Sequence, residues 1–542
     1  MVAFGLARLE RLELANGLRH CRRIGAVIGL CVVQAACSTS QQAGISSPDD
    51  PQTRDLITQT IELVATRYID PISREQILVN TLDGLAEIDD NIRVGITPDD
   101  LVLQYDDRTI QTISLPQSAY DASTPEGAQI WSEITLRGLG SYRAYSSLLR
   151  TTPTADVQSA LVSGAIRNLD RYSRYEGPKQ AETARNRRDG YIGIGVRLVG
   201  GTGYPVVKLV HPESPADTAG LHPGDQIVSV NGLDMYGKAS GVAAELLHGE
   251  EGTSVRIEVN SAGTVDITPM EIMRERVIDR TVFTELRDNV LIARITSFNS
   301  ATATALADSI LKAQLYDGGL QGVILDLRGN RGGLLQQGVA VADLFLPNGP
   351  IGNTFSRVTA ARHIFTAETN DLSDGAPLVV LIDGRTASSA ELVAAALQDR
   401  HRAVLVGSTS FGKGSVQAIN DLPNQGTLTF TWSRMTAPSG YTFDRIGLFP
   451  AICTQSDDRN AIHQVSTALS QREQIAAVMV KWRNLDYQDE KSRRELRNVC
   501  PANTNADRFD VEVALELLKN RPEYKNLAFV GQQEIADTFA AH

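Results

Sequence analysis

The sequence is poor in cysteine and histidine, and it has no long basic run. Five cysteines in 542 residues exclude a scaffold held together by many disulfides. The eight histidines show no HExxH spacing, and neither CxxC nor EF-hand spacing occurs, so no local motif supports a metal site. A net charge of −12 argues against nucleic-acid binding. The shares of hydrophobic (42%) and charged (21%) residues are those of an ordinary globular protein, and the length suits three or four domains of roughly 150 residues.

Long apolar runs are also missing. The N-terminal stretch from Ile24 to Ala36 has 13 residues, whereas a membrane-spanning helix takes about 20. Basic residues precede it and small residues follow it, which is the order of a secretory signal. We predict a signal peptide over residues 1–36 and a protein of the bacterial cell envelope, in the periplasm. The end of the stretch resembles a bacterial lipoprotein signal with lipidation at Cys37. The alternatives are plain cleavage near Ala36, which gives a soluble protein, and a buried N-terminal helix.

Lipidation would leave Cys453 and Cys500 as the only cysteines of the exported chain that are available to pair. In an oxidising compartment these two could form one disulfide. Two buried free thiols are the alternative, and the sequence does not decide between them.

Changes in hydrophobic periodicity divide the chain into parts. Helical spacing of apolar residues gives way near Gly190 to short strands separated by Gly, Pro and Asn turns. From Val290 onward predicted strands and helices alternate, which indicates an α/β layered structure. The fold class is therefore multidomain α/β. The expected parts are a signal peptide (1–36), a tether (37–54), a helical N-terminal region (55–187), a β-rich domain (188–278), an α/β core (279–454) and a helical C-terminal region (455–542).

One candidate for chemistry is the segment DGRTASSAE at residues 383–391, between a predicted strand and a predicted helix. A serine at such a turn is exposed, and the N–H groups of the following turn can hold an oxyanion. No G-x-S-x-G motif occurs, so a Ser-His-Asp hydrolase has no local support. The structural alternative is a capping box of Ser388 and Glu391, which contributes about 1 kcal/mol to the start of a helix.

A second candidate is GSTSFGKGSVQ at residues 407–417. It nearly matches the phosphate-binding G-x-x-x-x-G-K-[ST], but Gly414 stands where Mg²⁺ needs a hydroxyl, and no helix is expected to follow. Lys413 could instead be a base, because burial lowers the pKa of a lysine from its usual value of about 10.4. Gln417 could hold the neutral amine without adding charge. A solvated surface lysine is the alternative.

The chain combines a β-rich domain with the DLRGNRGG segment at 326–333, TASSAE and FGKGSVQ. In this combination it resembles the carboxyl-terminal processing peptidases, or tail-specific proteases, over about residues 155–452. The resemblance implies a serine-type endopeptidase with a PDZ domain. By position, Ser388 matches the nucleophile, Lys413 the general base and Gln417 the residue that orients the lysine. The oxyanion hole would use the Ser389 N–H and a glycine of the pair Gly332 and Gly333.

The same resemblance assigns the PDZ domain. SPA at 214–216, AGL at 219–221 and GDQI at 224–227 match its core. Clustered N–H groups would hold the terminal carboxylate of a peptide added to a sheet edge. The expected substrate-binding residues are Tyr191, Ile192, Gly193, Ile194 and Gly195. Among the departures from the family pattern, Arg331 stands where proline is common, and His248 stands where arginine is frequent.

Three hypotheses follow. The first is a protease with a Ser-Lys dyad that recognises protein C-termini through its PDZ domain and cleaves exported proteins. The second is a catalytically inactive PDZ scaffold that binds peptides, and the third is a nucleotide binder. The expected partners are polypeptides with free C-termini. Residues 95–150 and 455–510, which have no clear counterpart in the family, could carry contacts to an adaptor or to a second copy of the chain. We expect no cofactor, no metal and no nucleic acid, and membrane contact only through a lipid on Cys37.

Overall fold

The structure is a computed structural model, and it describes residues 50–530 except 117–124, 201, 263–265, 456, 487 and 506. The predictions of a signal peptide, of lipidation at Cys37 and of most of the tether lie outside these residues. Within the described ranges, no helix has the length and apolar character needed to cross a membrane.

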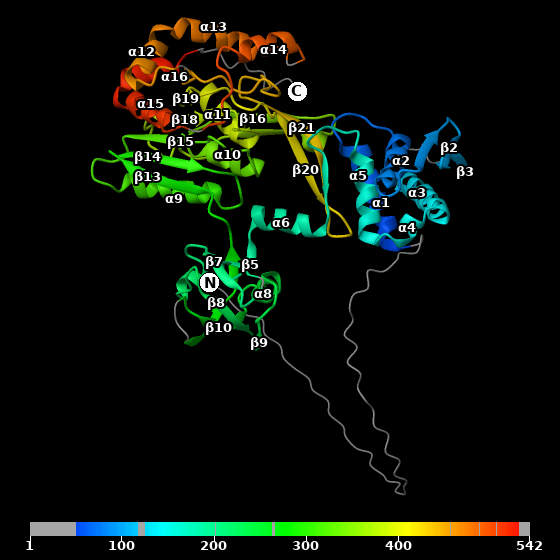
Figure 1. Ribbon diagram of the computed structural model, residues 1–542. Coiled ribbons are helices and arrows are strands. Elements are labelled where there is room, and N and C mark those ends of the chain that lie inside the picture. Colours follow the sequence, from blue (N-terminus) through cyan, green and yellow to red (C-terminus); the bar gives the residue numbers. More distant parts are fainter. Residues whose placement is uncertain are drawn as a thin grey trace, which may run out of the picture. The chain divides into compact units, whose positions relative to one another are not determined.

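The N-terminal region is mainly helical (Figure 1). Its helices are α1 (Pro51–Arg67), α2 (Arg74–Asp83), η1 (Gly84–Glu87), α3 (Pro125–Tyr145), α4 (Ser147–Thr151), α5 (Thr154–Ile166) and α6 (Pro178–Asp189). Asp50 begins α1 by accepting the N–H groups of Gln52 and Thr53. Trp131 and Tyr142 of α3 lie in the core of this region together with apolar side chains of α1, α2 and α5.

A three-stranded antiparallel sheet also belongs to this region, although the sequence predicted a helical region over residues 55–187. Its strands are β1 (Ile92–Ile96), β2 (Asp100–Tyr105) and β3 (Arg108–Ser114). The two residues that join β2 to β3, Asp106 and Asp107, have φ of 52° and 58°. Two positive φ values are what a tight two-residue hairpin requires, and aspartate tolerates them. Leu101 and Leu103 point to the buried face, so the alternation is present but too short to stand out.

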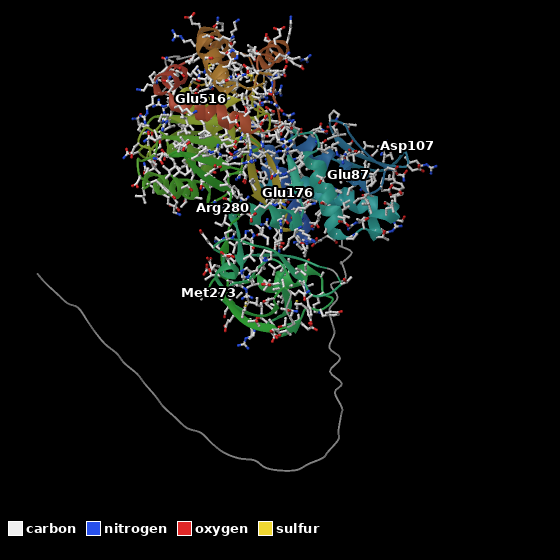
Figure 2. The ribbon with its side chains drawn as sticks, turned by 60° about the vertical axis from the view of Figure 1, so that its left-hand side comes forward. Glu87, Asp107, Glu176, Met273, Arg280 and Glu516 are labelled. Carbon is white, nitrogen blue, oxygen red and sulfur yellow. A yellow bond between two sulfur atoms is a disulfide. The ribbon has the colours of Figure 1, made fainter. Side chains whose placement is uncertain are left out.

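The next part is a β-rich domain. Its strands are β5 (Tyr191–Gly193), β6 (Val196–Val199), β7 (Val206–Val210), β8 (Gln226–Val230), β9 (Leu233–Asp234), β10 (Ser254–Asn260), β11 (Ile267–Met273) and β12 (Glu275–Val277), and its helices are α7 (Pro215–Thr218) and α8 (Ser240–Leu247). The larger sheet has the order β11-β10-β8-β7-β6, and β5 pairs with β12. Met273, at the end of β11, is on the outer face of this domain (Figure 2). One edge of the larger sheet is β6, and α8 packs beside it.

The α/β core is built on a six-stranded sheet of order β13-β14-β15-β18-β19-β22. Its elements are β13 (Val282–Arg287), β14 (Val290–Ile295), α9 (Thr302–Gln314), β15 (Gly322–Asp326), α10 (Leu335–Asp343), β18 (Leu378–Ile382), α11 (Ser389–Asp399), β19 (Ala403–Gly407) and β22 (Ile452–Cys453). From β14 onward all neighbours are parallel. Every residue of β15, β18 and β19 is buried, as expected for parallel strands covered on both faces.

A second sheet of order β17-β16-β21-β20 completes the core, and the short strand β4 adds to β21. The strands are β4 (Arg174–Glu176), β16 (Pro350–Phe355), β17 (His363–Thr366), β20 (Ser415–Asp421) and β21 (Thr427–Thr436), with the short helix η3 (Thr359–Ala361) between β16 and β17. Strand β20 directly follows Lys413, where the phosphate-binding motif would require a helix.

The C-terminal region is helical, as predicted. Its helices are α12 (Ala461–Ser470), α13 (Arg472–Arg483), α14 (Glu490–Arg497), α15 (Arg508–Lys519) and α16 (Arg521–Ala528). Val513, Ala514 and Leu517 of α15 are buried in the same hydrophobic core as the six-stranded sheet. Glu516 lies on the outer side of α15 and pairs with Lys519 (Figure 2). The helices therefore cover a face of the sheet, which is the reason that β15 and β18 are buried on both sides.

Candidate active site

Three sequence motifs leave the same edge of the central sheet. The segment that begins at Asp326 follows β15, the segment that contains Ser388 follows β18, and the segment that contains Lys413 follows β19. Because these strands are parallel neighbours, their carboxyl ends meet, and ligands of α/β sheets bind at that edge. The sheet topology thus gathers residues that are far apart in the sequence.

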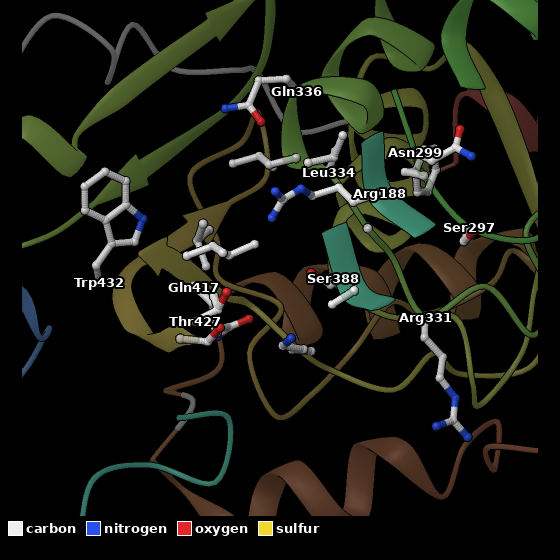
Figure 3. Close-up of a pocket in the computed structure, with 18 of the residues that line it drawn as sticks. Arg188, Ser297, Asn299, Arg331, Leu334, Gln336, Ser388, Gln417, Thr427 and Trp432 are labelled. Atoms are coloured by element: carbon white, nitrogen blue, oxygen red, sulfur yellow. The ribbon is translucent and has the colours of Figure 1, made fainter. Parts of the chain in front are cut away.

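Ser388, Lys413 and Gln417 line one cleft of about 570 Å³. Figure 3 shows Ser388 and Gln417 on either side of this cleft, with Trp432 beyond Gln417 and Leu334 and Arg188 above. In the part of the chain that the structure describes, no hydrogen bond joins Ser388, Lys413 and Gln417 to one another. Catalytic hydrogen bonds are often long without a substrate and shorten when one is bound.

Ser388 has a strained backbone. Its φ of 60° and ψ of −125° lie in a region that residues with a side chain rarely occupy. Glu391 stabilises this backbone conformation, because its Oε2 accepts the Ser388 N–H at 3.0 Å. Only this half of the predicted capping box is formed, because the Ser388 side chain makes no capping hydrogen bond. The hydroxyl is therefore available at the half-buried start of α11.

Lys413 is a partly buried lysine without a carboxylate partner among the described residues. Burial and, next, the positive charge of Arg174 lower the pKa of its amine to about 8. Its Nζ lies 4.8 Å from the ring centroid of Tyr172, a cation–π distance. A substantial fraction of this amine is neutral near pH 8, which a solvated lysine would not provide.

Gln417 is held by two hydroxyls. Its Nε2 donates to Ser415 Oγ at 3.0 Å and to Thr431 Oγ1 at 3.2 Å. In this orientation of the amide, the carbonyl oxygen makes no hydrogen bond to any described residue. The side chain thus offers an uncharged acceptor in the cleft that contains Lys413.

The two glycines differ in what their N–H groups do. The Gly332 N–H donates to Asn330 Oδ1 at 2.8 Å, whereas the Gly333 N–H has no acceptor among the described residues. Neither position tolerates a side chain: a Cβ on Gly332 would lie 2.8 Å from Ser388 Cβ, and one on Gly333 would lie 2.1 Å from the Phe298 oxygen. Gly333 lines the cleft with Ser388, and Gly332 does not.

Ser389 is the first residue of α11, so its N–H has no partner inside the helix. No described residue accepts this N–H. The Gly333 N–H, in a loop that lines the same cleft as Ser388, and the Ser389 N–H are therefore both without an acceptor among the described residues.

Glu391 is the residue whose importance sequence analysis missed. It is fully buried and forms no ion pair with any described residue, and burial raises the pKa of its carboxyl to about 6. Besides the Ser388 N–H, it accepts the Ser410 hydroxyl and the N–H groups of Gly412 (2.7 Å) and Lys413 (2.8 Å). The capping-box spacing was its only signal in the sequence. Because these N–H groups are occupied, they are not free to cradle a phosphate, as the nucleotide-binding hypothesis requires.

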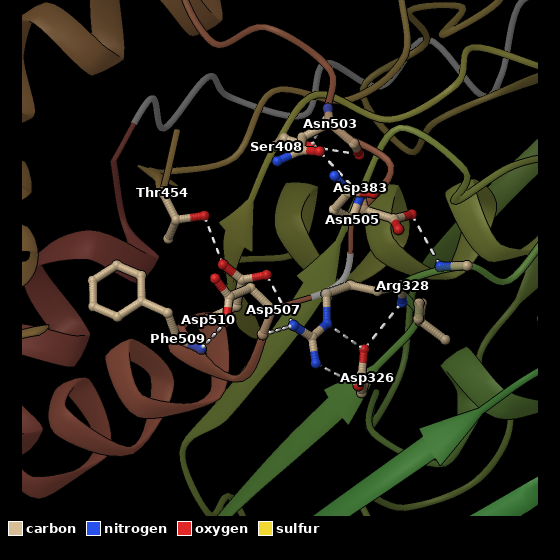
Figure 4. A network of polar contacts seen from close by, with 12 residues as sticks. Asp326, Arg328, Asp383, Ser408, Thr454, Asn503, Asn505, Asp507, Phe509 and Asp510 are labelled. Carbon is tan, nitrogen blue, oxygen red and sulfur yellow. Dashed lines mark hydrogen bonds and ion pairs between the residues drawn. The ribbon is translucent and has the colours of Figure 1, made fainter. Parts of the chain in front are cut away.

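Residues of the C-terminal region form hydrogen bonds and ion pairs with the loops that follow β15, β18 and β19 (Figure 4). The Asn503 oxygen accepts the Gly384 N–H at 2.6 Å, and the Asn503 N–H donates to Ser408 Oγ at 3.0 Å. Buried Arg328 pairs with Asp326 (2.8 Å) and with Asp510 of α15 (2.9 Å). These contacts join the loops after β15, β18 and β19 to one segment of chain.

Cys453 and Cys500 form a disulfide, with their Cα atoms 5.9 Å apart. Cys453 ends β22, and the Cys500 carbonyl accepts the Thr409 hydroxyl at 2.6 Å. The disulfide thus connects the edge strand of the sheet to the segment that contacts the loop before Lys413.

The predicted peptide-binding residues lie at one end of the β-rich domain. Tyr191, Ile192 and Gly193 form β5 and pair with β12. Gly195 has a φ of 87°, and a Cβ there would meet Ser214 at 2.3 Å. His248 lies beside this loop, with its ring centroid 5.0 Å from that of Tyr191. The loop leads into β6, whose free edge beside α8 is where an extended peptide can add.

Within the described ranges, no group of three or more His, Cys, Asp or Glu side chains is arranged to hold a metal ion. Two sequence families match the chain: "Peptidase family S41" over residues 289–453 and "PDZ domain" over residues 206–261. The first covers the core that contains Ser388 and Lys413, and the second covers most of the β-rich domain.

Known relatives agree with these matches. The carboxy-terminal-processing protease of Bartonella bacilliformis is 33% identical over 299 residues, which is 54% of this chain and 68% of that protein. The carboxy-terminal processing protease CtpA of Bacillus subtilis is also 33% identical, over 55% of this chain and 65% of its own length. Among solved structures, the photosystem II D1 C-terminal processing protease matches 70% of this chain and 92% of its own at 24% identity, with a TM-score of 0.34. The chain therefore belongs to the carboxy-terminal-processing protease family and is a serine-type peptidase with a PDZ domain.

Proposed function

We propose that this peptidase cleaves peptide bonds with a Ser-Lys dyad, in which Ser388 is the nucleophile and Lys413 the general base. The observation that carries the proposal is the state of Lys413. It is partly buried, unpaired with any described carboxylate and has a pKa lowered to about 8, and it lines the same cleft as the strained Ser388. An uncharged amine can accept the hydroxyl proton, as imidazole does in other serine peptidases.

The reaction follows from these positions. As Ser388 Oγ attacks the peptide carbonyl, its proton passes to Lys413 Nζ. The developing oxyanion accepts hydrogen bonds from the Gly333 and Ser389 N–H groups, which have no other described acceptor. Lys413 then gives the proton to the leaving amine, and an acyl-enzyme remains. Water, deprotonated by the same amine, releases the second product and restores Ser388.

Gln417 orients the base in this proposal. With its amide nitrogen bonded to the hydroxyls of Ser415 and Thr431, Gln417 presents its carbonyl oxygen as an acceptor for the Lys413 amine. A carboxylate at this position would stabilise the ammonium form and raise the pKa of the lysine. The amide therefore positions the amine without removing its basicity.

The substrate is proposed to be a polypeptide with a free C-terminus. The loop Tyr191–Gly195 and the free edge of β6 offer the PDZ domain a place to bind that end. We further propose that the chain is exported and acts on exported proteins in the bacterial periplasm, with a lipid on Cys37. The support for export is the order of residues in the first 37 positions. Fractionation of cells and the mass of the mature N-terminus test it, and an unprocessed cytoplasmic protein would refute it.

The test of catalysis compares the wild-type protein with Ser388→Ala and Lys413→Ala on a denatured protein substrate, with the products read by mass spectrometry. Thermal unfolding verifies that each variant is folded. We expect cleavage by the wild-type protein and at least a thousandfold loss in each variant, because removal of a nucleophile or its base has effects of that order. Undiminished digestion by Ser388→Ala refutes the dyad. Peptide binding without cleavage by any of the three proteins supports the inactive PDZ scaffold instead.

A further inference from the structure

The cleft that contains Ser388 is strongly cationic, although the protein as a whole has a net charge of −12. Five arginines line it against a single carboxylate, that of Glu176. The arginines are Arg174, Arg185, Arg187, Arg188 and Arg331. Charges of one sign lining a cleft raise the local concentration of ligands of the opposite sign.

Three of these arginines have anionic partners. Arg174 pairs with Glu176 (3.5 Å), Arg185 with Asp421 (3.3 Å) and Arg188 with Asp189 (2.8 Å). Arg187 and Arg331 have no partner among the described residues, and both are exposed. Two guanidinium groups at the cleft are therefore available to a ligand.

Helix α6 holds three of the arginines at the cleft. At its C-terminal end, the Arg188 carbonyl accepts the Ser300 N–H at 3.0 Å, beside the cleft residues Phe298 and Asn299. Arg185 reaches the other side, where it also contacts the Gln425 carbonyl and Thr427. Since α6 is attached to two parts of the core, Arg187 between these attachments is held at the cleft.

Arg331 belongs to another segment of the cleft lining. It lies two residues before Gly333, in the loop that would hold the oxyanion. Figure 3 shows its guanidinium directed away from Ser388, whereas the Arg188 side chain extends over the cleft. Arg331 can thus reach a substrate side chain some residues from the cleaved bond, but not the bond itself.

The rest of the lining combines polar side chains with apolar ones. Phe298, Leu334, Phe365, Trp432 and Met435 contribute to it. A peptide that fits this cleft would place apolar side chains against these residues and anionic groups against the arginines. Guanidinium groups bind carboxylates through charge-assisted, often bidentate hydrogen bonds.

We propose that this cleft selects peptides with Asp or Glu side chains within a few residues of the scissile bond, and that Arg187 and Arg331 are the specificity-determining residues. The proposal rests on the proposed peptidase function. The terminal carboxylate of a short substrate has the same chemistry as an acidic side chain, so the experiment must separate these two sources.

The experiment uses the full-length chain and matched peptides that contain one cleavable site. The flanking residues are Glu in one peptide and Gln in the other, and each is made with a free and with an amidated C-terminus. We expect kcat/KM for the Glu peptide to exceed that for the Gln peptide by roughly threefold or more, with either C-terminus. The ratio should fall toward one at high salt, because exposed charges are screened.

The variants assign the effect to residues. In Arg187→Gln/Arg331→Gln the Glu-to-Gln ratio should approach one, and in Arg331→Lys most of it should remain because the charge is kept. The control Arg108→Gln removes the positive charge of an exposed arginine of β3 outside the cleft and should keep the wild-type ratio.

Equal cleavage of the Glu and Gln peptides by the wild-type protein overturns the proposal while leaving the peptidase function intact. The proposal is also overturned if amidation of the C-terminus abolishes preferential cleavage and exchange of Glu for Gln beside the scissile bond has no effect. In that case the terminal carboxylate would be the ligand of the arginines. If the wild-type protein cleaves neither these peptides nor a denatured protein, the proposed function itself fails, and this inference fails with it.

Discussion

Ser388 and Lys413 hydrogen-bond the same carboxylate oxygen. Oε2 of Glu391 accepts the Ser388 N–H at 3.0 Å and the Lys413 N–H at 2.8 Å, and Oε1 accepts the Gly412 N–H at 2.7 Å. The two residues belong to loops after different strands, and a buried side chain fixes their backbones to each other. Glu391 bonds to the backbone N–H of Lys413 and forms no salt bridge with its amine. A salt bridge would stabilise the ammonium form and raise the pKa of the amine, so its absence favours Lys413 as a base.

Replacement of Glu391 by Gln should therefore disturb both residues at once. The amide retains one acceptor oxygen and turns an NH₂ group toward buried donors, and each unpaired donor costs about 1–3 kcal/mol. We expect a lower melting temperature and a fall in kcat of more than tenfold. Thermal unfolding and steady-state kinetics measure both.

Glu473→Gln is the matched control, because Glu473 is exposed in the first turn of α13. It should change neither quantity. Wild-type kcat in folded Glu391→Gln would show that the shared carboxylate does not position the two loops.

The pH dependence of the reaction should follow the Lys413 amine. Its neutral form is the active one, so kcat/KM should rise with pH and level off above the pKa of about 8. Lys413→Arg keeps the charge but cannot lose its proton, and it should be inactive at every pH. Initial rates measured over a range of pH give this rising part of the kcat/KM profile. A profile that is flat through pH 8, with chemistry limiting turnover, would argue against a lysine base.

Arg174→Gln tests one cause of the lowered pKa. The positive charge of Arg174 disfavours the protonated form of Lys413, so its removal should raise the pKa of the amine. Because Arg174 is exposed, solvent screens its charge, and the rising part of the profile should move only slightly to higher pH. The pH profile of kcat/KM measures the shift, and Arg108→Gln should leave the rising part in place. A downward shift would contradict the assignment.

Loss of the disulfide between Cys453 and Cys500 should destabilise the protein. It joins residues separated by 47 positions, and a loop of that size corresponds to about 4 kcal/mol in the chain-entropy model. We expect a lower melting temperature after reduction or in Cys453→Ala/Cys500→Ala. Reductant should have no further effect on the double variant, and equal melting temperatures with and without the disulfide would contradict the prediction.

Much of the fold could be predicted from local pattern. The alternation of strands and helices after Val290 predicted the α/β core because buried parallel strands are continuous apolar runs. The three-stranded sheet near Leu101 was missed because its strands are short and only partly buried. The strands of the second sheet were missed for a related reason: β16, β17 and β20 mix buried and exposed residues without a regular period.

The sequence by itself determined which residue types stand at the candidate site, since TASSAE and FGKGSVQ are contiguous and can be recognised locally. Only the tertiary structure decided that Glu391 joins Ser388 to Lys413, that the Gly333 N–H rather than the Gly332 N–H is unpaired, and that arginines of α6 line the same cleft. Each of these depends on contacts between segments far apart in the chain. Burial, and with it the pKa of a lysine, exists only once those segments have packed together.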